Sequence, residues 1–284
     1  MGDLDGARVV VTGGASGIGL GLAQVAIERG AAAVVLGDIE PTALERAGEH
    51  LDGGHRARVL TAAVDVTDPI AMDGLARRCD EELGGVDLVC LNAGVFSGGH
   101  AWEVTDDDWA WVLGVNLGGV ANGIRSFVPS LIERGSPASV LITASIAGVV
   151  AAPVSAPYVT SKFAAVGLAE ALHHDLELVG ADHVGVSVLC PGMVSTNIGN
   201  GGRNRPADLP AATSTGASRL ADAGIADAME SGVDPVEGAR SVFDQLARGR
   251  FYVSTHPVRM WERLVGNEND DRLHGRAPRF QMYD

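Results

Sequence analysis

Tyr158 and Lys162 stand four residues apart, and Ser145 lies thirteen residues upstream at the end of an apolar run. Side chains at a spacing of four share one face of a helix. A tyrosine hydroxyl has a pKa of about 10, and a nearby ammonium favours its phenolate form. The pair is therefore predicted to act as a general acid and base, with the serine hydroxyl donating to a developing oxyanion. The alternative is an ordinary helix pair with a packed tyrosine and a solvated lysine.

A glycine-rich segment over residues 12–19 (TGGASGIG) directly follows the first apolar run. Glycines permit a tight turn and a close backbone approach, and free amides at a helix start bind pyrophosphate. The spacing is G-x-x-x-G-x-G, which differs from the G-x-G-x-x-G of the general dinucleotide fingerprint. A flexible turn is the alternative, but the position after the first of several parallel-type strands favours a dinucleotide site.

Asp38 ends the second predicted strand, nineteen residues beyond Gly19. An acidic side chain there can accept hydrogen bonds from a ribose and repel a 2′-phosphate. No Lys or Arg occurs between Gly30 and Glu45, so no cation in this stretch is positioned to bind that phosphate. NAD is therefore favoured over NADP. The alternative is that Asp38 caps the next helix or faces solvent.

The elements that must position these residues are short apolar segments that alternate with segments of helical spacing. The apolar segments lack polar alternation, which is typical of parallel strands covered on both faces. The predicted strands are residues 8–12, 33–37, 57–65, 86–91, 138–143, 184–189 and 251–254. The predicted helices are residues 17–30, 40–51, 68–83, 106–134, 157–179 and 235–248. The alternation predicts an α/β fold, a Rossmann-type doubly wound parallel sheet flanked by helices.

The whole chain, residues 1–284, is predicted to form a single domain with residues 6–190 as its dinucleotide-binding and catalytic core. Residues 191–234 show little periodicity and are expected to form an irregular substrate-binding loop or lid. Two alternatives stay open for the polar tail, residues 266–284: disorder, or wrapping around a partner subunit.

Together these features resemble the short-chain dehydrogenases/reductases. The resemblance covers roughly residues 6–200 and rests on motifs that follow that family's order. The matching motifs are the glycine segment, Asp65-Val66, Asn92-Ala93-Gly94, Asn116, Ser145, Tyr158, Lys162, Pro191-Gly192 and Thr196. The resemblance implies a hydride transfer between a nicotinamide cofactor and a small-molecule substrate.

The resemblance also implies a role for each catalytic residue. Tyr158 would donate or remove the proton on the substrate oxygen, and Lys162 would lower the pKa of Tyr158 and bind the nicotinamide ribose. Ser145 would orient the substrate carbonyl or hydroxyl. Asn116 would hold a water that links Lys162 to solvent.

The cofactor-binding residues are implied in the same way. Asp65 and Val66 would lie against adenine, and Val194 and Thr196 would contact the carboxamide. The full implied set is Gly13, Ala15, Ser16, Gly17, Ile18, Gly19, Asp38, Asp65, Val66, Asn92, Ala93, Gly94, Tyr158, Lys162, Pro191, Gly192, Val194 and Thr196.

The predicted function is an NAD(P)-dependent oxidoreductase acting on a secondary alcohol or ketone, with NAD favoured. A hydrophobic substrate is expected, because several apolar residues could surround a pocket; plain core packing is their alternative. These residues are Val149, Val150, Ala151, Ala152, Pro153, Met193, Phe96 and Trp261. Two other classes remain as alternatives: a noncatalytic NAD-binding sensor or scaffold, and a Rossmann-like methyltransferase.

For three further groups of residues no catalytic role is predicted. His100 is interpreted as an exposed loop residue, and His173 and His174 are given no role. Three tryptophans are expected to anchor the start of the helix over residues 106–134. They are Trp102, Trp109 and Trp111.

Composition narrows the partners and the location. The net charge of −15 opposes binding to nucleic-acid phosphates or anionic lipids. No signal peptide is recognised, and no apolar run approaches the ~18 residues that span a bilayer. The three cysteines form no CxxC pair, so we expect buried thiols, no metal site and a cytoplasmic location. A homodimer through the helices that carry Asn116 and Tyr158 is favoured over a homotetramer.

Overall fold

One parallel sheet organises the computed structural model, which describes residues 4–53, 56–212 and 214–279. In these residues seven strands lie in the order β3-β2-β1-β4-β5-β6-β7, and every pairing is parallel. The strands are β1 (Arg8–Thr12), β2 (Ala33–Asp38), β3 (Arg58–Ala63), β4 (Leu88–Leu91), β5 (Ala138–Thr143), β6 (Val184–Leu189) and β7 (Tyr252–Val253). The predicted α/β fold is confirmed, and β1, β5 and β6 have the predicted bounds.

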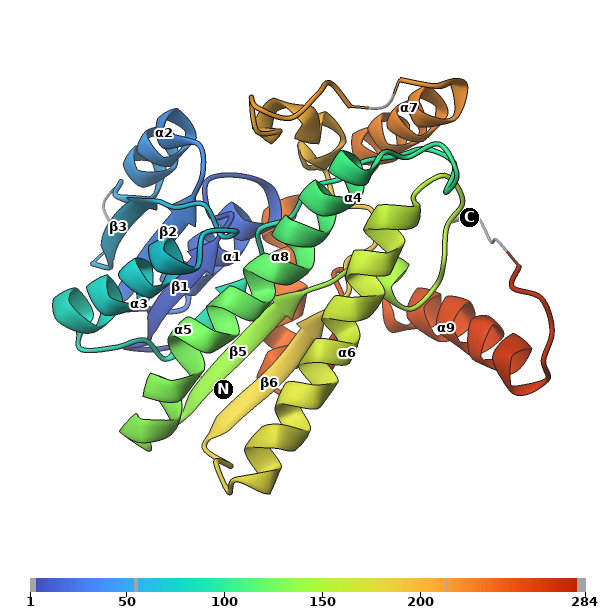
Figure 1. Ribbon diagram of the computed structural model, residues 1–284. Helices are drawn as coiled ribbons and strands as arrows, with labels where there is room; N and C mark the ends of the chain where they lie inside the picture. The colour runs from blue at the N-terminus through green and yellow to red at the C-terminus, as the bar shows by residue number, and fades with distance from the viewer. Residues whose placement is uncertain (1–3, 54–55, 213, 280–284) are drawn as a thin grey trace.

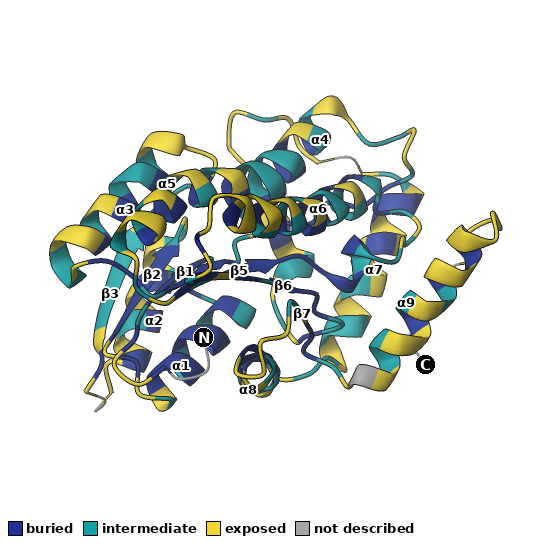
Figure 2. Cartoon of the chain, turned by 90° about the horizontal axis from the view of Figure 1, so that it is seen from below, coloured by how far each residue is buried: buried dark blue, intermediate teal, exposed yellow. Residues whose placement is uncertain are grey.

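Helices cover both faces of the sheet (Figure 1). Viewed from below, α3, α5 and α6 lie on one side of the strands, and α1, α2 and α8 lie on the other (Figure 2). Their bounds are α1 (Gly17–Glu28), α2 (Pro41–Leu51), α3 (Pro69–Leu83), α4 (Asp106–Leu113), α5 (Gly119–Arg134), α6 (Ala156–Leu178), α7 (Gly216–Glu230), α8 (Pro235–Leu246) and α9 (Val258–Leu273). This double cover explains why most of the strands read as continuous apolar runs.

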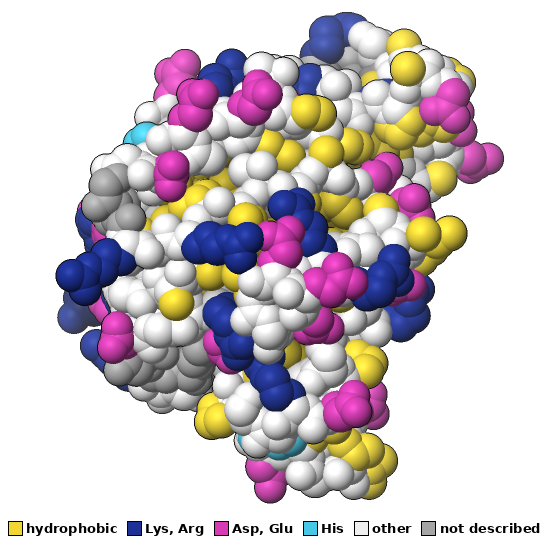
Figure 3. All heavy atoms as spheres, turned by 90° about the vertical axis from the view of Figure 1, so that its left-hand side faces the viewer, with side chains coloured by type: hydrophobic (Ala, Val, Ile, Leu, Met, Phe, Trp, Pro, Cys, Tyr) yellow, Lys and Arg dark blue, Asp and Glu magenta, His cyan; other side chains and the backbone are white. Residues whose placement is uncertain are grey.

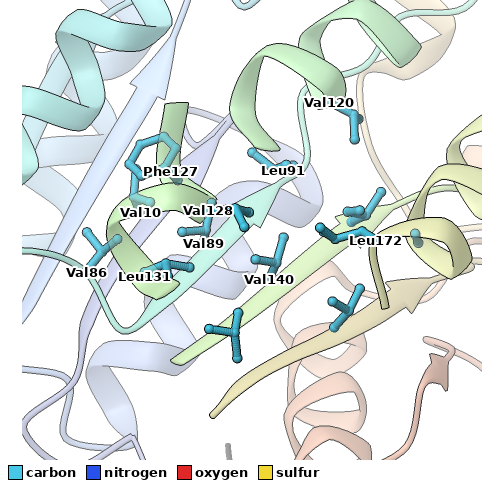
Figure 4. Close-up of a cluster of buried hydrophobic side chains, with 14 of the residues drawn as sticks. Val10, Val86, Val89, Leu91, Val120, Phe127, Val128, Leu131, Val140 and Leu172 are labelled. Atoms are coloured by element: carbon cyan, nitrogen blue, oxygen red, sulfur yellow. The ribbon is translucent and has the colours of Figure 1, made fainter. Parts of the chain in front are cut away.

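Each face of the sheet has its own apolar core. On one face, Phe127 and Leu131 of α5 and Leu172 of α6 pack over the valines of β1, β4 and β5 (Figure 4). Phe127 is 1% exposed and Leu131 is fully buried. Burying a side chain of this size contributes roughly 1.5–3 kcal/mol, so this layer fixes α5 and α6 against the sheet.

The predicted helix over residues 106–134 is interrupted by one π-helical turn, Gly114–Gly118, which carries Asn116. The helix lies very close to the sheet here, because a Cβ on Gly119 would come within 2.6 Å of Val66 and one on Gly123 within 2.3 Å of Leu91. Turns of this type are rare and often mark functional sites. Asn116 is therefore presented from an irregular turn that periodicity alone did not predict.

The prediction of an irregular segment over residues 191–234 is wrong in part. A short 3-10 helix covers Ile198–Asn204, and α7 begins after a capping box formed by Thr215 and Ser218. Only small side chains of α7 are buried, including Ala217 and Ala221. The Gly, Ser and Ala residues of this segment suggested a loop, whereas α7 is a helix with small side chains on its buried face.

Disorder is also wrong for most of the polar tail. Helix α9 extends to Leu273, and the chain then returns so that Arg276 and Arg279 both pair with Asp271 at 2.7 and 2.8 Å. Residues 280–284 of the predicted tail lie outside the described residues. In the described part of the chain, no helix has the length and apolarity needed to cross a bilayer.

Charges of both signs are mixed on the face that carries α2 and α3 (Figure 3). Arg58 pairs with Glu82 at 2.5 Å, and Arg125 pairs with Asp73 at 3.3 Å. This face therefore carries paired surface charges and not a field of one sign.

Candidate active site

The candidate active site lies at the carboxyl ends of β1, β4, β5 and β6. The strands are parallel, so the segments that follow them meet at one edge of the sheet. The glycine segment, the loop from Asn92, Ser145 and Pro191 are the residues brought together there. Backbone bonds join the last two segments, because the N–H of Ile146 donates to the carbonyl of Pro191 at 2.9 Å.

Ser145, Tyr158 and Lys162 converge as the sequence predicted. The Ser145 side chain lies near enough to the Tyr158 hydroxyl to lower its pKa, and Ser145 Oγ accepts from the N–H of Ala147 at 3.1 Å. Lys162 is 2% exposed, and its Nζ lies 5.6 Å from the centre of the Tyr158 ring. The same Nζ donates to the carbonyl of Thr143 at 3.1 Å. A proton carrier, a hydroxyl donor and a buried cation thus share one small region.

Burial disfavours the charged forms of Lys162 and Tyr158 and so shifts the pKa of each side chain. It lowers the pKa of Lys162 to about 8. It also raises the pKa of Tyr158, and the hydrogen bond from Ser145 opposes that rise. The lowering of the Tyr158 pKa expected from Lys162 is therefore not the dominant effect in the protein alone, because desolvation of the phenolate outweighs it.

Asn116 is fully buried and every atom of its amide is engaged. Its Oδ1 accepts from the N–H of Val95 at 2.8 Å, and its Nδ2 donates to the carbonyl of Val95 and to Ser161 Oγ. A Cβ on Gly94 would lie 3.3 Å from both Asn116 Oδ1 and Lys162 Nζ. Asn116 thus fixes the loop after β4 beside Lys162, and its role with a bound water stays a prediction.

The glycine segment forms a tight cradle. A Cβ on Gly19 would lie 2.1 Å from the carbonyl oxygen of Gly13, and Gly13 itself has a φ of 64°. Asn92 holds this turn, because its Nδ2 donates to the carbonyls of Thr12 and Gly13 at 3.1 and 3.3 Å. The Thr12 hydroxyl in turn accepts from the N–H groups of Asn92 and Ala93. These bonds therefore fix the start of the loop that continues with Ala93 and Gly94 beside the glycine segment.

Asp38 faces this cradle. Its carboxylate accepts from the N–H of Ala15 at 3.0 Å and from the N–H of Glu40 at 3.1 Å. Burial raises the pKa of Asp38, while both backbone donors oppose the rise. The alternative that Asp38 caps α2 is wrong, because the cap position is Glu40.

A pocket of about 310 Å³ adjoins Asp38, and it contains cations that the sequence interpretation missed. Its lining includes Ser16 of the cradle, Arg46 of α2 and Arg203 of the segment after β6. Arg46 lies one residue beyond Glu45, where the cation-free stretch ends. Arg203 is far away in sequence and is brought close to Glu40 by the fold. The absence of cations between residues 30 and 45 therefore does not describe the surroundings of Asp38.

The other implied cofactor residues lie around the same edge. Val66 is buried against α5, whereas the carboxylate of Asp65 accepts from the N–H and hydroxyl of Thr67. Thr196 reaches the cradle, because a Cβ on Gly17 would lie 3.0 Å from its methyl group. Val194 is 2% exposed and pairs with the strand-like segment at Val233. The cofactor contacts implied for Asp65, Val66, Val194 and Thr196 stay predictions.

His256 is a neighbour that sequence reasoning missed. A Cβ on Gly192 would lie 2.8 Å from its ring, so this glycine permits a close approach. Burial lowers the pKa of His256, and its Nδ1 lies 2.8 Å from the Thr255 hydroxyl. No local spacing signals the contact, because β7 brings His256 to the site.

The predicted aromatic residues separate into two places. Phe96 contacts Tyr158 edge to face, with ring centres 5.2 Å apart, so it borders the Tyr158 ring. Trp261 lies near Tyr252, whose hydroxyl binds Glu170 three turns along α6 from Tyr158. Trp261 thus packs near β7, and a pocket formed by Trp261, residues 149–153 and Met193 stays a prediction.

The prediction that the tryptophans anchor the start of the helix is confirmed only in part. Trp111 is 6% exposed and packs as predicted, but Trp102 is 80% exposed and stacks on His100 at 4.6 Å. His173 and His174 face one carboxylate on the surface of α6, that of Glu177. The three cysteines are buried and their thiols are free.

The segment after β6 is fastened by a buried ion pair that the sequence did not reveal. Arg205 donates to Asp108 Oδ1 at 2.6 Å, and the two side chains are 7% and 0% exposed. The guanidinium lies 5.4 Å from the centre of the Trp111 ring, and its Nη2 has no hydrogen-bond partner among the described residues. The signal available was indirect: Arg203 and Arg205 are the first charges after residue 190.

Comparisons with known proteins agree with this geometry. The model of the short chain dehydrogenase family matches residues 7–206. A short chain dehydrogenase/reductase from Burkholderia phymatum, solved in complex with NAD, is 36% identical with a TM-score of 0.93, and each chain is covered completely. The protein therefore belongs to the short-chain dehydrogenase/reductase family of oxidoreductases.

Two curated relatives show the range of similar enzymes. A CLA biosynthesis dehydrogenase/reductase from Lactiplantibacillus plantarum is 33% identical over 90% of both chains. A 1-deoxy-11-beta-hydroxypentalenate dehydrogenase from Streptomyces exfoliatus is 42% identical over 66% of this chain and 67% of its own. The two relatives are named for different reactions, so membership of the family leaves several substrates open.

Proposed function

We propose that the protein is an NAD-dependent dehydrogenase/reductase that interconverts a hydrophobic secondary alcohol and its ketone. The observation that carries the proposal is the convergence of Tyr158 and Ser145 beside the buried ammonium of Lys162. A sensor or scaffold would have no use for a buried cation next to a proton carrier. We also take residues 1–284 as one functional unit.

The residues present fit a dinucleotide. The cradle has no room for a Cβ at Gly13 or Gly19, and it leaves backbone amides at the start of α1 to bind a pyrophosphate. Asp38 lies at the end of β2, where its carboxylate can accept from ribose hydroxyls. A bound nicotinamide cofactor would supply the hydride acceptor in oxidation and the hydride donor in reduction.

The protein's own residues would then move the proton. In oxidation, Tyr158 as phenolate takes the alcohol proton, and in reduction the neutral hydroxyl returns it to the developing alkoxide. Ser145 donates a hydrogen bond to the substrate oxygen as negative charge develops on it. Lys162 places a positive charge near the phenolate and can bind a ribose hydroxyl.

NAD preference is proposed on the carboxylates of Asp38 and Glu40, which would oppose a 2′-phosphate. The NAD complex of the 36% identical relative supports this choice. Arg46 and Arg203 act against it, but Arg203 is already paired with Glu40 at 3.0 Å. A hydrophobic substrate is supported by Phe96 against Tyr158 and by the apolar residues 149–153.

The decisive experiment is nucleotide-monitored turnover across a panel of secondary alcohols with NAD and NADP, and of ketones with the reduced forms. Turnover with a preference for NAD is expected. Tight NAD binding without turnover across the panel would contradict the catalytic proposal and support the sensor. A preference for NADP would contradict only the assignment of Asp38 and Glu40.

A further inference from the structure

Residues 196–205, called the strap here, connect the glycine cradle, one wall of the proposed cofactor site, with the loop after β4, the opposite wall. At one wall, Thr196 contacts the glycine cradle, and Asn197 and Arg203 line the same pocket as Ser16. At the opposite wall, a Cβ on Gly201 would lie 3.4 Å from the backbone of Phe96. Figure 1 shows this part of the chain above the strand ends, between α2 and α4.

Near its carboxyl end, the strap is fastened to Glu40 by an exposed contact. Glu40 Oε1 accepts from Arg203 Nε and from Asn204 Nδ2, each at 3.0 Å. The Arg203 and Glu40 side chains are 29% and 33% exposed. Arg203 also donates to the carbonyls of Asn197 and Asn200 at 2.9 and 2.8 Å, which ties the strap together. Water and salt reach this contact, so its strength is modest.

The next residue, Arg205, fastens the strap to the opposite wall through its buried pair with Asp108. This 2.6 Å contact is protected from solvent, and Arg205 Nε also donates to the carbonyl of Pro210 at 2.8 Å. Opening this contact would leave a buried charge without its partner, which is strongly unfavourable. The strap is therefore expected to open at Glu40 and to stay attached at Asp108.

We propose that Glu40 is a positioning residue that latches the strap over the bound cofactor and so sets how fast the cofactor leaves. The nature of the ligand rests on the proposed function, whereas the latch itself is a contact of the protein alone. Glu40 would hold the cofactor through the strap, apart from any part it has in cofactor preference.

Glu40→Gln tests the latch, and Glu28→Gln is its matched control. Glu28 also accepts from one arginine and one amide, Arg240 at 2.8 Å and Gln24 at 3.1 Å, and its side chain is 30% exposed. It lies at the far end of α1 from the cradle. The two variants therefore remove similar contacts, one on the strap and one away from it.

The first measurement is hydrogen exchange of the protein without nucleotide. Glu40→Gln is expected to speed exchange in the strap about threefold, and Glu28→Gln to leave it unchanged. The second is NADH dissociation by stopped-flow fluorescence, where about a threefold faster release is expected for Glu40→Gln alone. Added salt should speed release from the wild type more than from Glu40→Gln, because it screens a contact that the variant lacks.

The outcomes separate the latch from the proposed function. Unchanged strap exchange in Glu40→Gln would overturn the latch, whether or not the protein binds NADH. Faster exchange with unchanged NADH release would overturn the role in cofactor retention. A wild type that binds no NADH would overturn both that role and the proposed function, while the exchange result would still decide the latch.

Discussion

Lys162 and Arg205 are both buried cations, but they are held in opposite ways. Lys162 donates to the carbonyl of Thr143 and, within the described residues, makes no ion pair; burial lowers its pKa to about 8. Arg205 has a carboxylate partner in Asp108 and an aromatic ring against its guanidinium. A buried cation without a counter-ion can favour a nearby phenolate, whereas a paired one mainly fastens two segments. The catalytic region and the strap thus use burial for different ends.

The largest effect is expected from a substitution in the region around Lys162. Tyr158→Phe removes the proton carrier but keeps the ring that packs on Phe96. Turnover is expected to fall by a factor on the order of 10² to 10⁴, with NADH binding nearly intact. Steady-state turnover and NADH titration check the two parts. Near-native turnover would show that Tyr158 does not carry the proton.

The next largest effect is expected at the strap. Asp108→Asn leaves Arg205 buried without its counter-ion, which should cost about 3–5 kcal/mol of unfolding free energy. Denaturant unfolding measures it. Glu82→Gln is the control, because it removes ion pairs with Arg58 and Arg78 at the surface and should change stability little. Equal small effects in the two variants would mean that burial adds nothing to the Arg205 pair.

Lys162→Met tests the unpaired cation through the pH dependence of stability. The pKa of Lys162 falls from 10.5 in its reference state to about 8 in the fold. Its charge therefore destabilises the fold fully below pH 8, and the penalty disappears as the pH rises through 10.5. At pH 7 the variant should gain at most about 3 kcal/mol, reduced by the lost bond to Thr143.

The measurement is unfolding of the wild type and Lys162→Met at several pH values between 7 and 10.5. The advantage of the variant is expected to shrink across this range. A difference that stays constant with pH would mean that the pKa of Lys162 is not depressed in the folded protein.

The smallest effects are expected from Ala substitutions of two glycines, one beside Lys162 and one against α7. They test whether the two regions can be disturbed separately. A Cβ on Gly94 would press on Lys162 and Asn116 at 3.3 Å, and one on Gly98 would lie 2.5 Å from the Cβ of Ala221 in α7. Each Ala substitution should cost about 1–3 kcal/mol through overpacking. Gly94→Ala is expected to lower kcat, and Gly98→Ala to raise the substrate KM. Steady-state kinetics would contradict this separation if both variants changed only the same constant.

Most of the fold was predictable because its signals are local. Seven apolar segments and the helices between them indicated a parallel sheet, and strand ends located the glycine segment, Asp38 and Ser145. The failures concern segments whose structure depends on contacts that the local pattern does not show. Helix α7 buries mainly alanines, and the described part of the tail is held by two arginines that return to Asp271.

The sequence by itself determined the sheet, the cradle and the set formed by Ser145, Tyr158 and Lys162. Spacing along one helix and position at a strand end place those groups without knowledge of distant contacts. Only the tertiary structure decided that Trp261 packs near Tyr252 and that the strap is fastened to both Glu40 and Asp108. Arg203 meets Glu40 across 163 residues, and Arg205 meets Asp108 across 97. Pairings over such separations have no periodic signal, because they depend on how complete elements pack.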